Sequence, residues 1–264
     1  MITAVGSIAL DTTRTVSGSV SEVPGGSVTF FALASSILAK TSVVSTVGGD
    51  FPRDFLKRME KRGIDVSNVT INPNEKTFRY HSTFSDDFST RSSDLTALNV
   101  FEKFEPVLTE SQRKKEVAYL GTLTPRIQLS VIEQLENPKL VAMDTIEFFI
   151  KTDRPEVDRV LSEVDCAILN ESEARELCGK TNIIACGKEI LRMGPEFCVI
   201  KKGEHGSILF SEDGSPNPFP AFPLENVVDP TGAGDAFAGG FVGYLASEHG
   251  SMKQQALLRA IAWG

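Results

Sequence analysis

The residues best suited to chemistry lie in the segment Asp229-Pro-Thr-Gly-Ala-Gly-Asp235, between a β-type run ending at Val228 and an apolar stretch with helical spacing. Gly232, Ala233 and Gly234 carry almost no side chain, so a ligand can approach their backbone N–H groups closely. The first N–H groups of a helix have no intrahelical partner and lie at the positive end of its dipole. The segment therefore predicts an anion site suited to a phosphoryl group.

Asp235 allows two interpretations of this segment. A carboxylate repels a bound phosphate, so its presence favours a chemical role, such as taking a proton from an attacking hydroxyl group. The alternative is a Gly-rich turn from strand to helix, in which the helix dipole favours an acidic residue in the first turn. Spacing alone does not separate the two, because short Gly-rich turns are weak signals.

Residues 229 to 237 closely resemble the C-terminal signature of the ribokinase-like, or PfkB, carbohydrate kinases. The resemblance implies that Asp235 is the catalytic base and that the Gly232-Ala233-Gly234 backbone forms an anion hole. It implies that Thr231 binds the nucleotide and that Asp229 contributes to a monovalent-cation site, for K⁺, as in several relatives. Phosphoryl transfer from ATP with Mg²⁺ becomes the leading hypothesis.

The N-terminal part of the chain carries the predicted acceptor site. Ile2 to Ala9 reads as a buried strand, and Asp11 follows it either as a turn carboxylate or, by the resemblance, as a ligand of substrate hydroxyls. Gly25-Gly26 opens a helix from Ser27 to about residue 39, like the family's N-terminal signature, so we expect Gly25, Gly26 and Ser27 to bind substrate. Phe30 is a departure, because the family often has Asn near this point, and the change predicts an altered specificity.

Two polar, β-rich stretches predict a small sheet outside the core. Residues 12–23 read as a half-exposed strand, and residues 77–84 alternate like a second one. In the family such a sheet covers the sugar and excludes water. We expect a lid from about 12–23 and 68–98. Arg91 could reach substrate from it, and so could His81, although a surface or pairing role suits both residues as well.

The rest of the chain alternates strands with helices, which indicates a mainly parallel sheet with right-handed crossovers. Ligands then belong at the carboxyl ends of the strands, where Asp11, Asp144, Asn170 and Asp235 fall. The predicted fold is a ribokinase-like three-layer α/β/α sandwich with a small β-sheet lid, formed as a single domain over residues 1–264. Because family members continue with a further segment, we also expect the C-terminal end to be truncated.

Two further motifs point to a nucleotide site. Asn170-x-x-Glu173 fits a capping box at a helix start, and by the resemblance it also organises hydrated Mg²⁺ and the nucleotide phosphates. Gly203 and Gly206 match a Gly-x-x-Gly turn of the family's nucleotide site. Lys201 precedes this turn where the family usually has Thr, and its ammonium could pair with a nucleotide phosphate or be solvated.

Bulk properties exclude several classes of protein. The chain has 264 residues, 41% of them hydrophobic, with a formal charge of −8, which argues against nucleic-acid and anionic-membrane partners. We see no membrane span and no signal peptide. The four cysteines form no Cys-x-x-Cys pair and read as buried free thiols, which suits a reducing cytoplasm.

The expected function is therefore ATP-dependent phosphorylation of a hydroxyl group on a sugar or polyol, in a branch distinct from ribokinase itself. A nucleoside kinase of the same fold and a non-catalytic binding relative are the alternatives. Family lids often pair, so a homodimer is expected.

Overall fold

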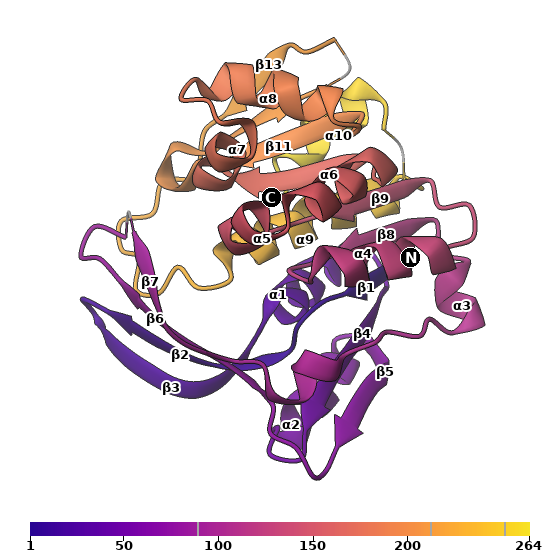
Figure 1. Cartoon of the computed structure of the whole chain (residues 1–264), viewed down its shortest axis with the longest axis vertical. Coiled ribbons are helices and arrows are strands. Elements are labelled where there is room, and N and C mark those ends of the chain that lie inside the picture. The colour runs from indigo at the N-terminus through magenta and orange to yellow at the C-terminus, as the bar shows by residue number, and fades with distance from the viewer. Residues whose placement is uncertain (89, 212, 251) are drawn as a thin grey trace.

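The computed structural model (Figure 1) describes residues 1–88, 90–211, 213–250 and 252–264. Among these residues, a nine-stranded sheet runs in the order β13-β12-β11-β10-β9-β8-β1-β4-β5. The strands from β11 to β5 in that order pair in parallel, and β12 and β13 pair antiparallel at one edge. The strands are β1 (Ile2–Val5), β4 (Thr41–Gly48), β5 (Asp65–Asn72), β8 (Val117–Leu120), β9 (Leu140–Met143), β10 (Cys166–Asn170), β11 (Phe197–Lys201), β12 (Ser207–Phe210) and β13 (Pro216–Phe219).

Helices cover both faces of this sheet, which gives the predicted three layers (Figure 1). One apolar cluster joins the sheet to α1 (Ser27–Ser35), α2 (Arg53–Lys61), α9 (Ala233–Ser247) and α10 (Gln254–Ala260). The other joins it to α4 (Pro125–Gln134), α5 (Glu147–Thr152), α6 (Arg154–Glu163), α7 (Glu171–Cys178) and α8 (Ile183–Arg192). The remaining helical elements of the described residues are the short α3 (Glu110–Arg113) and the 3₁₀ turns η1 (Asn99–Lys103) and η2 (Gly203–His205). The central strands are buried on both faces, as parallel strands between helices must be.

Helix α9, which follows the Gly-rich motif, packs closely on α1. A Cβ atom at Gly239 would lie 2.4 Å from the carbonyl oxygen of Phe31, and one at Gly243 would lie 3.1 Å from Cα of Ser35. Glycine lowers the intrinsic stability of a helix, but here it lets two backbones approach without side chains between them. The packing therefore fixes the start of α9 beside the start of α1.

The lid is a separate four-stranded sheet in the order β3-β2-β6-β7, and it projects from the body of the molecule (Figure 1). Its strands are β2 (Ala9–Thr15), β3 (Gly18–Gly25), β6 (Phe78–Phe84) and β7 (Arg91–Ala97). Residues 12–23 were predicted as one strand, but they form parts of the two strands of a lid hairpin. The predicted range 68–98 was wrong at its start, because residues 68–72 belong to β5 at the edge of the main sheet. Residue 89, inside the second range, lies outside the described residues.

The prediction of a β-type run before the Gly-rich motif was also wrong. Between β13 and α9 the described chain forms no strand, and Val227 and Val228 are exposed. Pro220 and Pro223 lack the N–H donors that a ladder needs, so this stretch has little to pair with the sheet edge.

The prediction of free thiols is confirmed for all four cysteines, and that of burial for Cys166, Cys186 and Cys198, whereas Cys178 is only half-buried. Within the described parts of the chain, no helix has the length and apolar character needed to cross a bilayer.

Candidate active site

The segment from Asp229 to Asp235 forms a tight loop that ends in α9. The Asp229 carboxylate accepts a hydrogen bond from the Thr231 N–H at 2.9 Å, and Gly232 adopts φ +76° at the helix N-cap. The Ala233 N–H donates to the Pro230 carbonyl at 3.1 Å, so it is already engaged in the turn. Among the described residues, no group accepts a hydrogen bond from the amides of Gly232, Gly234 and Asp235. These three amides are therefore free to bind an anion.

Asp235 lies half-buried in the first turn of α9. The pKa of its carboxyl is raised to about 7, chiefly by burial and then by the charge of Asp144, against the opposing effects of Lys201 and Arg91. A carboxyl group with a pKa near neutrality can accept a proton more effectively than an ordinary aspartate. This is the property that a general base next to an anion site requires.

Lys201, at the end of β11, forms an ion pair with Asp144, which directly follows β9. The Nζ atom lies 2.9 Å from Oδ2, and the two side chains are only 14% and 7% exposed. Burial alone lowers the pKa of the Lys201 ammonium, but Asp144 and Glu173 more than offset this and raise it above its ordinary value. A Cβ atom at Gly234 would lie 3.1 Å from Nζ, so the charged ammonium lies directly beside the anion loop.

Asp144 is a residue for which the sequence suggested a position but no role. It follows the buried strand β9 in the same way that Asn170 ends β10, and this shared position was the available signal. Its link to Lys201 spans 57 residues and could not be read from spacing.

Asn170 and Glu173 form the predicted capping box at the start of α7. The Asn170 Oδ1 accepts from the Glu173 N–H at 2.8 Å, and the Asn170 N–H donates to Glu173 Oε2 at 2.7 Å. The pKa of the Glu173 carboxyl is raised to about 8, chiefly by burial and then by Asp144, with Lys201 opposing. Parallel register places Asn170 beside Lys201, so the capping box adjoins the anion loop.

The donor set near this edge fits a hydrated Mg²⁺ ion better than a fully liganded one. Within the described parts of the chain, no three His, Cys, Asp or Glu side chains gather as a metal centre. Mg²⁺ keeps several of its waters and commonly takes one or two carboxylates together with substrate phosphates. Glu173, whose Oε1 makes no bond to the described residues, suits contact through such waters.

Asp11 lies on the lid strand β2 and points to the start of α1. Its Oδ2 accepts a hydrogen bond from the Gly26 N–H at 3.2 Å, and its pKa is raised to about 6, chiefly by burial. A Cβ atom at Gly25 would lie 1.9 Å from this oxygen, so the carboxylate requires glycine there. Gly26 itself has φ +94°. Asp11 also contributes to the raised pKa of Asp235, so the two carboxylates lie close enough for their charges to interact.

Ser27 and Phe30 differ in their relation to this site. The Ser27 hydroxyl is buried and bonded to Ser7, which places it in the packing under the first turn of α1 rather than beside a ligand. The Phe30 ring lies against the anion loop, since a Cβ atom at Gly232 would be 2.3 Å from its carbons. Phe30 is half-buried and can form an apolar wall next to the loop.

Arg91 contributes a positive charge from the lid. Its guanidinium lies 5.4 Å from the centre of the Tyr80 ring, and it lowers the pKa values of Asp11, Glu173 and Asp235. Tyr80 pairs with Asp11 across β2 and β6, so both project from the same face of the lid. His81 follows Tyr80 in the strand and faces the other side, where it lines a small cavity with Arg14 and Asp94.

Hydroxyl groups of the lid hold the anion loop. The Thr13 Oγ1 lies 3.1 Å from Thr231 Oγ1, and the Thr15 hydroxyl donates to the Val228 carbonyl at 3.0 Å.

Gly203 and Gly206 form the tight turn after Lys201, with φ +57° and +81°. A Cβ atom at Gly206 would lie 1.9 Å from the Phe219 carbonyl oxygen, so the packing of β13 alone requires glycine there.

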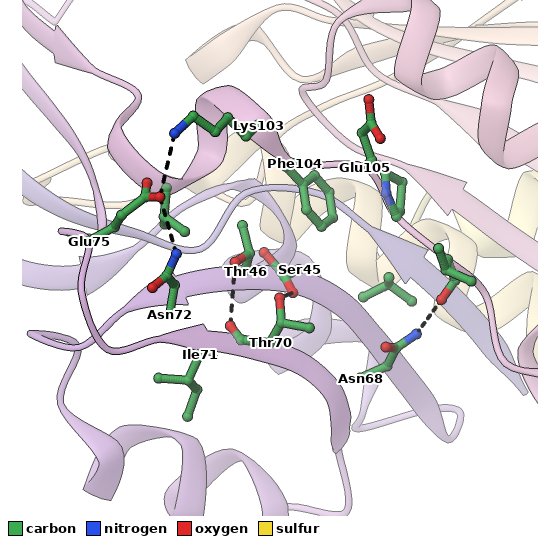
Figure 2. A pocket seen from close by; sticks show the side chains of 14 residues that line it. Ser45, Thr46, Asn68, Thr70, Ile71, Asn72, Glu75, Lys103, Phe104 and Glu105 are labelled. Atoms are coloured by element: carbon green, nitrogen blue, oxygen red, sulfur yellow. Dashed lines mark hydrogen bonds and ion pairs between the residues drawn. The ribbon is translucent and has the colours of Figure 1, made fainter.

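A cavity of about 470 Å³ lies elsewhere, between β4, β5 and residues 99–107 (Figure 2). Ser45, Thr46 and Thr70 lie on one side of it, and Phe104 and Glu105 on the other. None of the predicted site residues lines it. It is thus distinct from the charged site at β9 to β11.

Comparison with known proteins identifies the family of the chain. Residues 1–263 match the sequence profile described as pfkB family carbohydrate kinase. The chain is 29% identical to a cytidine kinase from Thermococcus kodakarensis over 252 residues, which are 91% of this chain and 87% of the relative.

Solved structures show the same fold. A nucleoside kinase from Methanocaldococcus jannaschii superposes with a TM-score of 0.78 at 18% identity, covering 99% of this chain and 89% of that one. A ribokinase from Thermotoga maritima superposes with a TM-score of 0.76 at 20% identity, covering 99% and 90%. The match of residues 1–263 to this profile makes the chain a member of the pfkB family of carbohydrate kinases, and therefore a phosphotransferase.

Proposed function

We propose that this kinase transfers the terminal phosphoryl group of ATP to a sugar hydroxyl of a nucleoside. The observation that carries the proposal is the half-buried Asp235 with a pKa of about 7, placed in the same turn as three unengaged amides. Asp235 takes the proton of the acceptor hydroxyl, whose oxygen forms a bond to phosphorus as the bond to the leaving phosphate oxygen breaks. The amides of Gly232 and Gly234 and the Lys201 ammonium stabilise the charge on the transferring group.

The remaining site residues follow from the same proposal. Asp11 accepts hydrogen bonds from acceptor hydroxyls, and Gly25 and Gly26 let the acceptor approach the start of α1. Phe30 beside the anion loop and Tyr80 on the lid offer flat faces on which a base can stack, and Arg91 lies over the Tyr80 ring. When bound, Mg²⁺ would neutralise phosphate charge, held through water by Glu173 and Asn170.

The preference for a nucleoside over the free sugar or polyol expected from the sequence depends on two findings. The relatives named above include a cytidine kinase and a nucleoside kinase. The lid also carries the Tyr80 and Phe84 rings under the Arg91 guanidinium, and such flat groups suit a base better than a small polyol. A free sugar remains the second candidate because the family is one of carbohydrate kinases and a ribokinase shares the fold.

Other parts of the earlier expectation stay predictions. They are a K⁺ site at Asp229 and Thr231, nucleotide contact by Gly203 and Gly206, a homodimer formed through the lid, and a cytoplasmic location. The Asp229 carboxylate is engaged with the Thr231 N–H, which leaves its second oxygen for a cation.

An ADP-release assay with cytidine, other nucleosides, ribose and polyols tests the proposal. We expect turnover with at least one nucleoside at a kcat/KM at least tenfold above that with any free sugar. D235N should reduce turnover by about 10²–10⁴-fold while nucleotide binding persists. Turnover with free sugars alone would move the assignment to the second candidate. Binding of nucleoside and ATP in calorimetry without turnover by the wild-type protein would favour a non-catalytic relative.

A further inference from the structure

The Asp144–Lys201 pair lies between the anion loop and the capping box, and Asp144 is held from several sides. Its Oδ1 accepts from the Thr145 N–H at 2.7 Å, its Oδ2 accepts from Lys201 Nζ at 2.9 Å, and its carbonyl accepts from Gln128 Nε2 at 2.9 Å. Gln128 is fully buried. The carboxylate therefore has one orientation, fixed by the end of β9.

Lys201 depends on this carboxylate for its own position. Lysine side chains have many rotamers, and an ammonium removed from water needs a partner for its charge. Among the described residues, Asp144 is the one group that forms an ion pair with Lys201. With that pair made, the lysine chain lies along Gly234, whose missing Cβ would be 3.1 Å from Nζ, 3.7 Å from Cε and 3.9 Å from Cδ.

We propose that Asp144 is a positioning residue for phosphoryl transfer: it holds the Lys201 ammonium against Gly234, where that ammonium can contact the transferring group. This inference rests on the proposed function and adds to it a residue that never touches the substrate. Asp144 acts on the transferring group only through Lys201, although its charge also raises the pKa of Asp235.

The chemistry of the amide substitution D144N makes the idea testable. In the variant the remaining oxygen can still accept from the Thr145 N–H. The Nδ2 group then faces Lys201, and because both groups are hydrogen-bond donors, they cannot bond to each other. Lys201 must leave its place or lose its proton. Removal of one charge-stabilising donor from an active site typically lowers kcat by about 10²–10³-fold. We expect a loss of that order for D144N and for K201Q, each measured with ATP and the best nucleoside.

The double variant D144N/K201Q separates positioning from any direct role of Asp144. If Asp144 acts on the transferring group through Lys201, the double variant should have the same kcat as K201Q within about twofold at a pH above the acid limb of both, because coupled residues are not additive. Losses that multiply would overturn the proposal, and so would a D144N protein as active as the wild type. The double variant also guards against misfolding, since D144N alone leaves a buried ammonium unpaired whereas the double variant buries no charge at this pair.

The pH profile of kcat/KM gives a readout that a merely structural pair would not change. The groups whose charges act on Asp235 are Asp144, Lys201, Arg91 and Asp11. Asp235 in turn raises the pKa of the buried Tyr119. Asp144 raises the pKa of Asp235 more strongly than Lys201 lowers it, so the acid limb should move to lower pH in D144N and to higher pH in K201Q. An acid limb that stays in place in both variants would contradict the proposal.

Nucleotide binding provides the second readout. In calorimetry, ATP should bind more weakly to D144N and K201Q by about tenfold, and AMP, which lacks the transferable group, should bind as it does to the wild type. The control is E189Q, which removes the carboxylate of the Lys180–Glu189 pair, also 2.9 Å long but on the surface of α8. A wild-type protein that neither binds ATP nor turns over would defeat the proposed function itself. If the wild type is active but the kcat losses of D144N and K201Q multiply in the double variant, only this inference is overturned.

Discussion

Two regions of the fold gather polar side chains, and they do so differently. At the carboxyl edge of β9 to β11, Asp144, Glu173 and Asp235 lie around Lys201, with raised pKa values at Glu173 and Asp235 and with unengaged amides nearby. In the cavity beside β5, the polar groups pair locally. Asn72 donates to Glu75 at 3.1 Å, Lys103 lies 3.7 Å from the same carboxylate, and Asn68 donates to the Val107 carbonyl at 2.9 Å (Figure 2).

This difference distinguishes a site that is completed by a ligand from a cavity whose polar groups already pair with one another. Like charges and unused donors cost free energy unless a ligand compensates for them, so their concentration at one edge indicates a site that is completed by binding. The cavity beside β5 has volume but no such imbalance. Each prediction below tests one side of this contrast, starting from the largest expected effect.

The largest effect should follow from G232A. The backbone at Gly232 has φ +76°, and a Cβ atom there would lie 2.3 Å from the Phe30 ring, so the loop must move. Because the amides and Asp235 share this turn, we expect kcat to fall by about 10²-fold or more. Steady-state kinetics with ATP and nucleoside measure it.

The matched control for G232A is G63A. Gly63 also has a positive φ, +80°, and it follows α2 far from the site in sequence. Apart from its two chain neighbours, no atom of the described residues lies within 4 Å of its missing Cβ. G63A should therefore cost stability by about 1 kcal/mol without lowering kcat. A G232A protein with wild-type turnover would show that the geometry of the loop is not required.

Arg91 should have the next largest effect. R91Q removes the lid charge that lowers the pKa values of Asp11, Glu173 and Asp235, so the acid limb of kcat/KM should move to higher pH. It also removes the guanidinium from the Tyr80 ring, and we expect kcat/KM for the nucleoside to fall about tenfold. R126Q, at an exposed arginine of α4 whose nearest acidic partner is 3.9 Å away, is the control. If R91Q and R126Q behave alike, the lid does not act on the site through Arg91.

A smaller effect concerns stability and pH. The folded-state pKa of Asp235 is about 7, above the unfolded value near 3.8, so the folded form holds this proton more tightly. The group therefore lowers stability progressively as the pH rises from about 4 to 7. D235N removes this penalty, and its stability gain over the wild type should be larger at pH 8 than at pH 5 by about 2 kcal/mol.

Denaturant titrations at the two pH values measure the D235N gain. D54N, at an exposed carboxylate of α2, is the control and should show no such dependence. An equal gain for D235N at pH 5 and pH 8 would mean that its carboxyl is not perturbed in the folded protein. The active site would then lose the imbalance that sets it apart from the cavity.

The sequence predicted the layers and the strand ends because both follow from local patterns. Buried runs such as Leu140–Met143 read as parallel strands, and Asn170-x-x-Glu173 read as a helix start. The misplaced lid boundary at residues 68–72 has a different cause. That stretch alternates like a half-exposed strand in either sheet, and only its pairing with β4 assigns it to the main sheet.

The grouping of the candidate site's residues could be predicted only where these residues share one motif. Gly232, Gly234 and Asp235 are neighbours in sequence, so their contact needs no tertiary information. Asp144 and Lys201 meet across two strands, and Ser27 turned inward to Ser7 because Gly6 and Gly121 leave room for its hydroxyl there. Such contacts depend on the order of strands in the sheet, which no local spacing contains.

The smallest effect is expected in the cavity beside β5. The Thr70 hydroxyl donates to the Ser45 carbonyl at 3.4 Å, a long bond, and its side chain lines the cavity (Figure 2). T70V keeps the shape of the side chain and removes the hydroxyl, so stability should change by less than about 1 kcal/mol. Because the cavity shares no residue with the charged edge, kcat and KM should stay within twofold of the wild type. The same assay with T13V, which removes a hydroxyl bonded to Thr231 in the anion loop, should show a clear loss. If T70V lowered kcat as much as T13V, the cavity would belong to the candidate active site. The Thr70 hydroxyl, which bonds to the neighbouring strand, would then affect turnover as much as the Thr13 hydroxyl, which bonds to the anion loop.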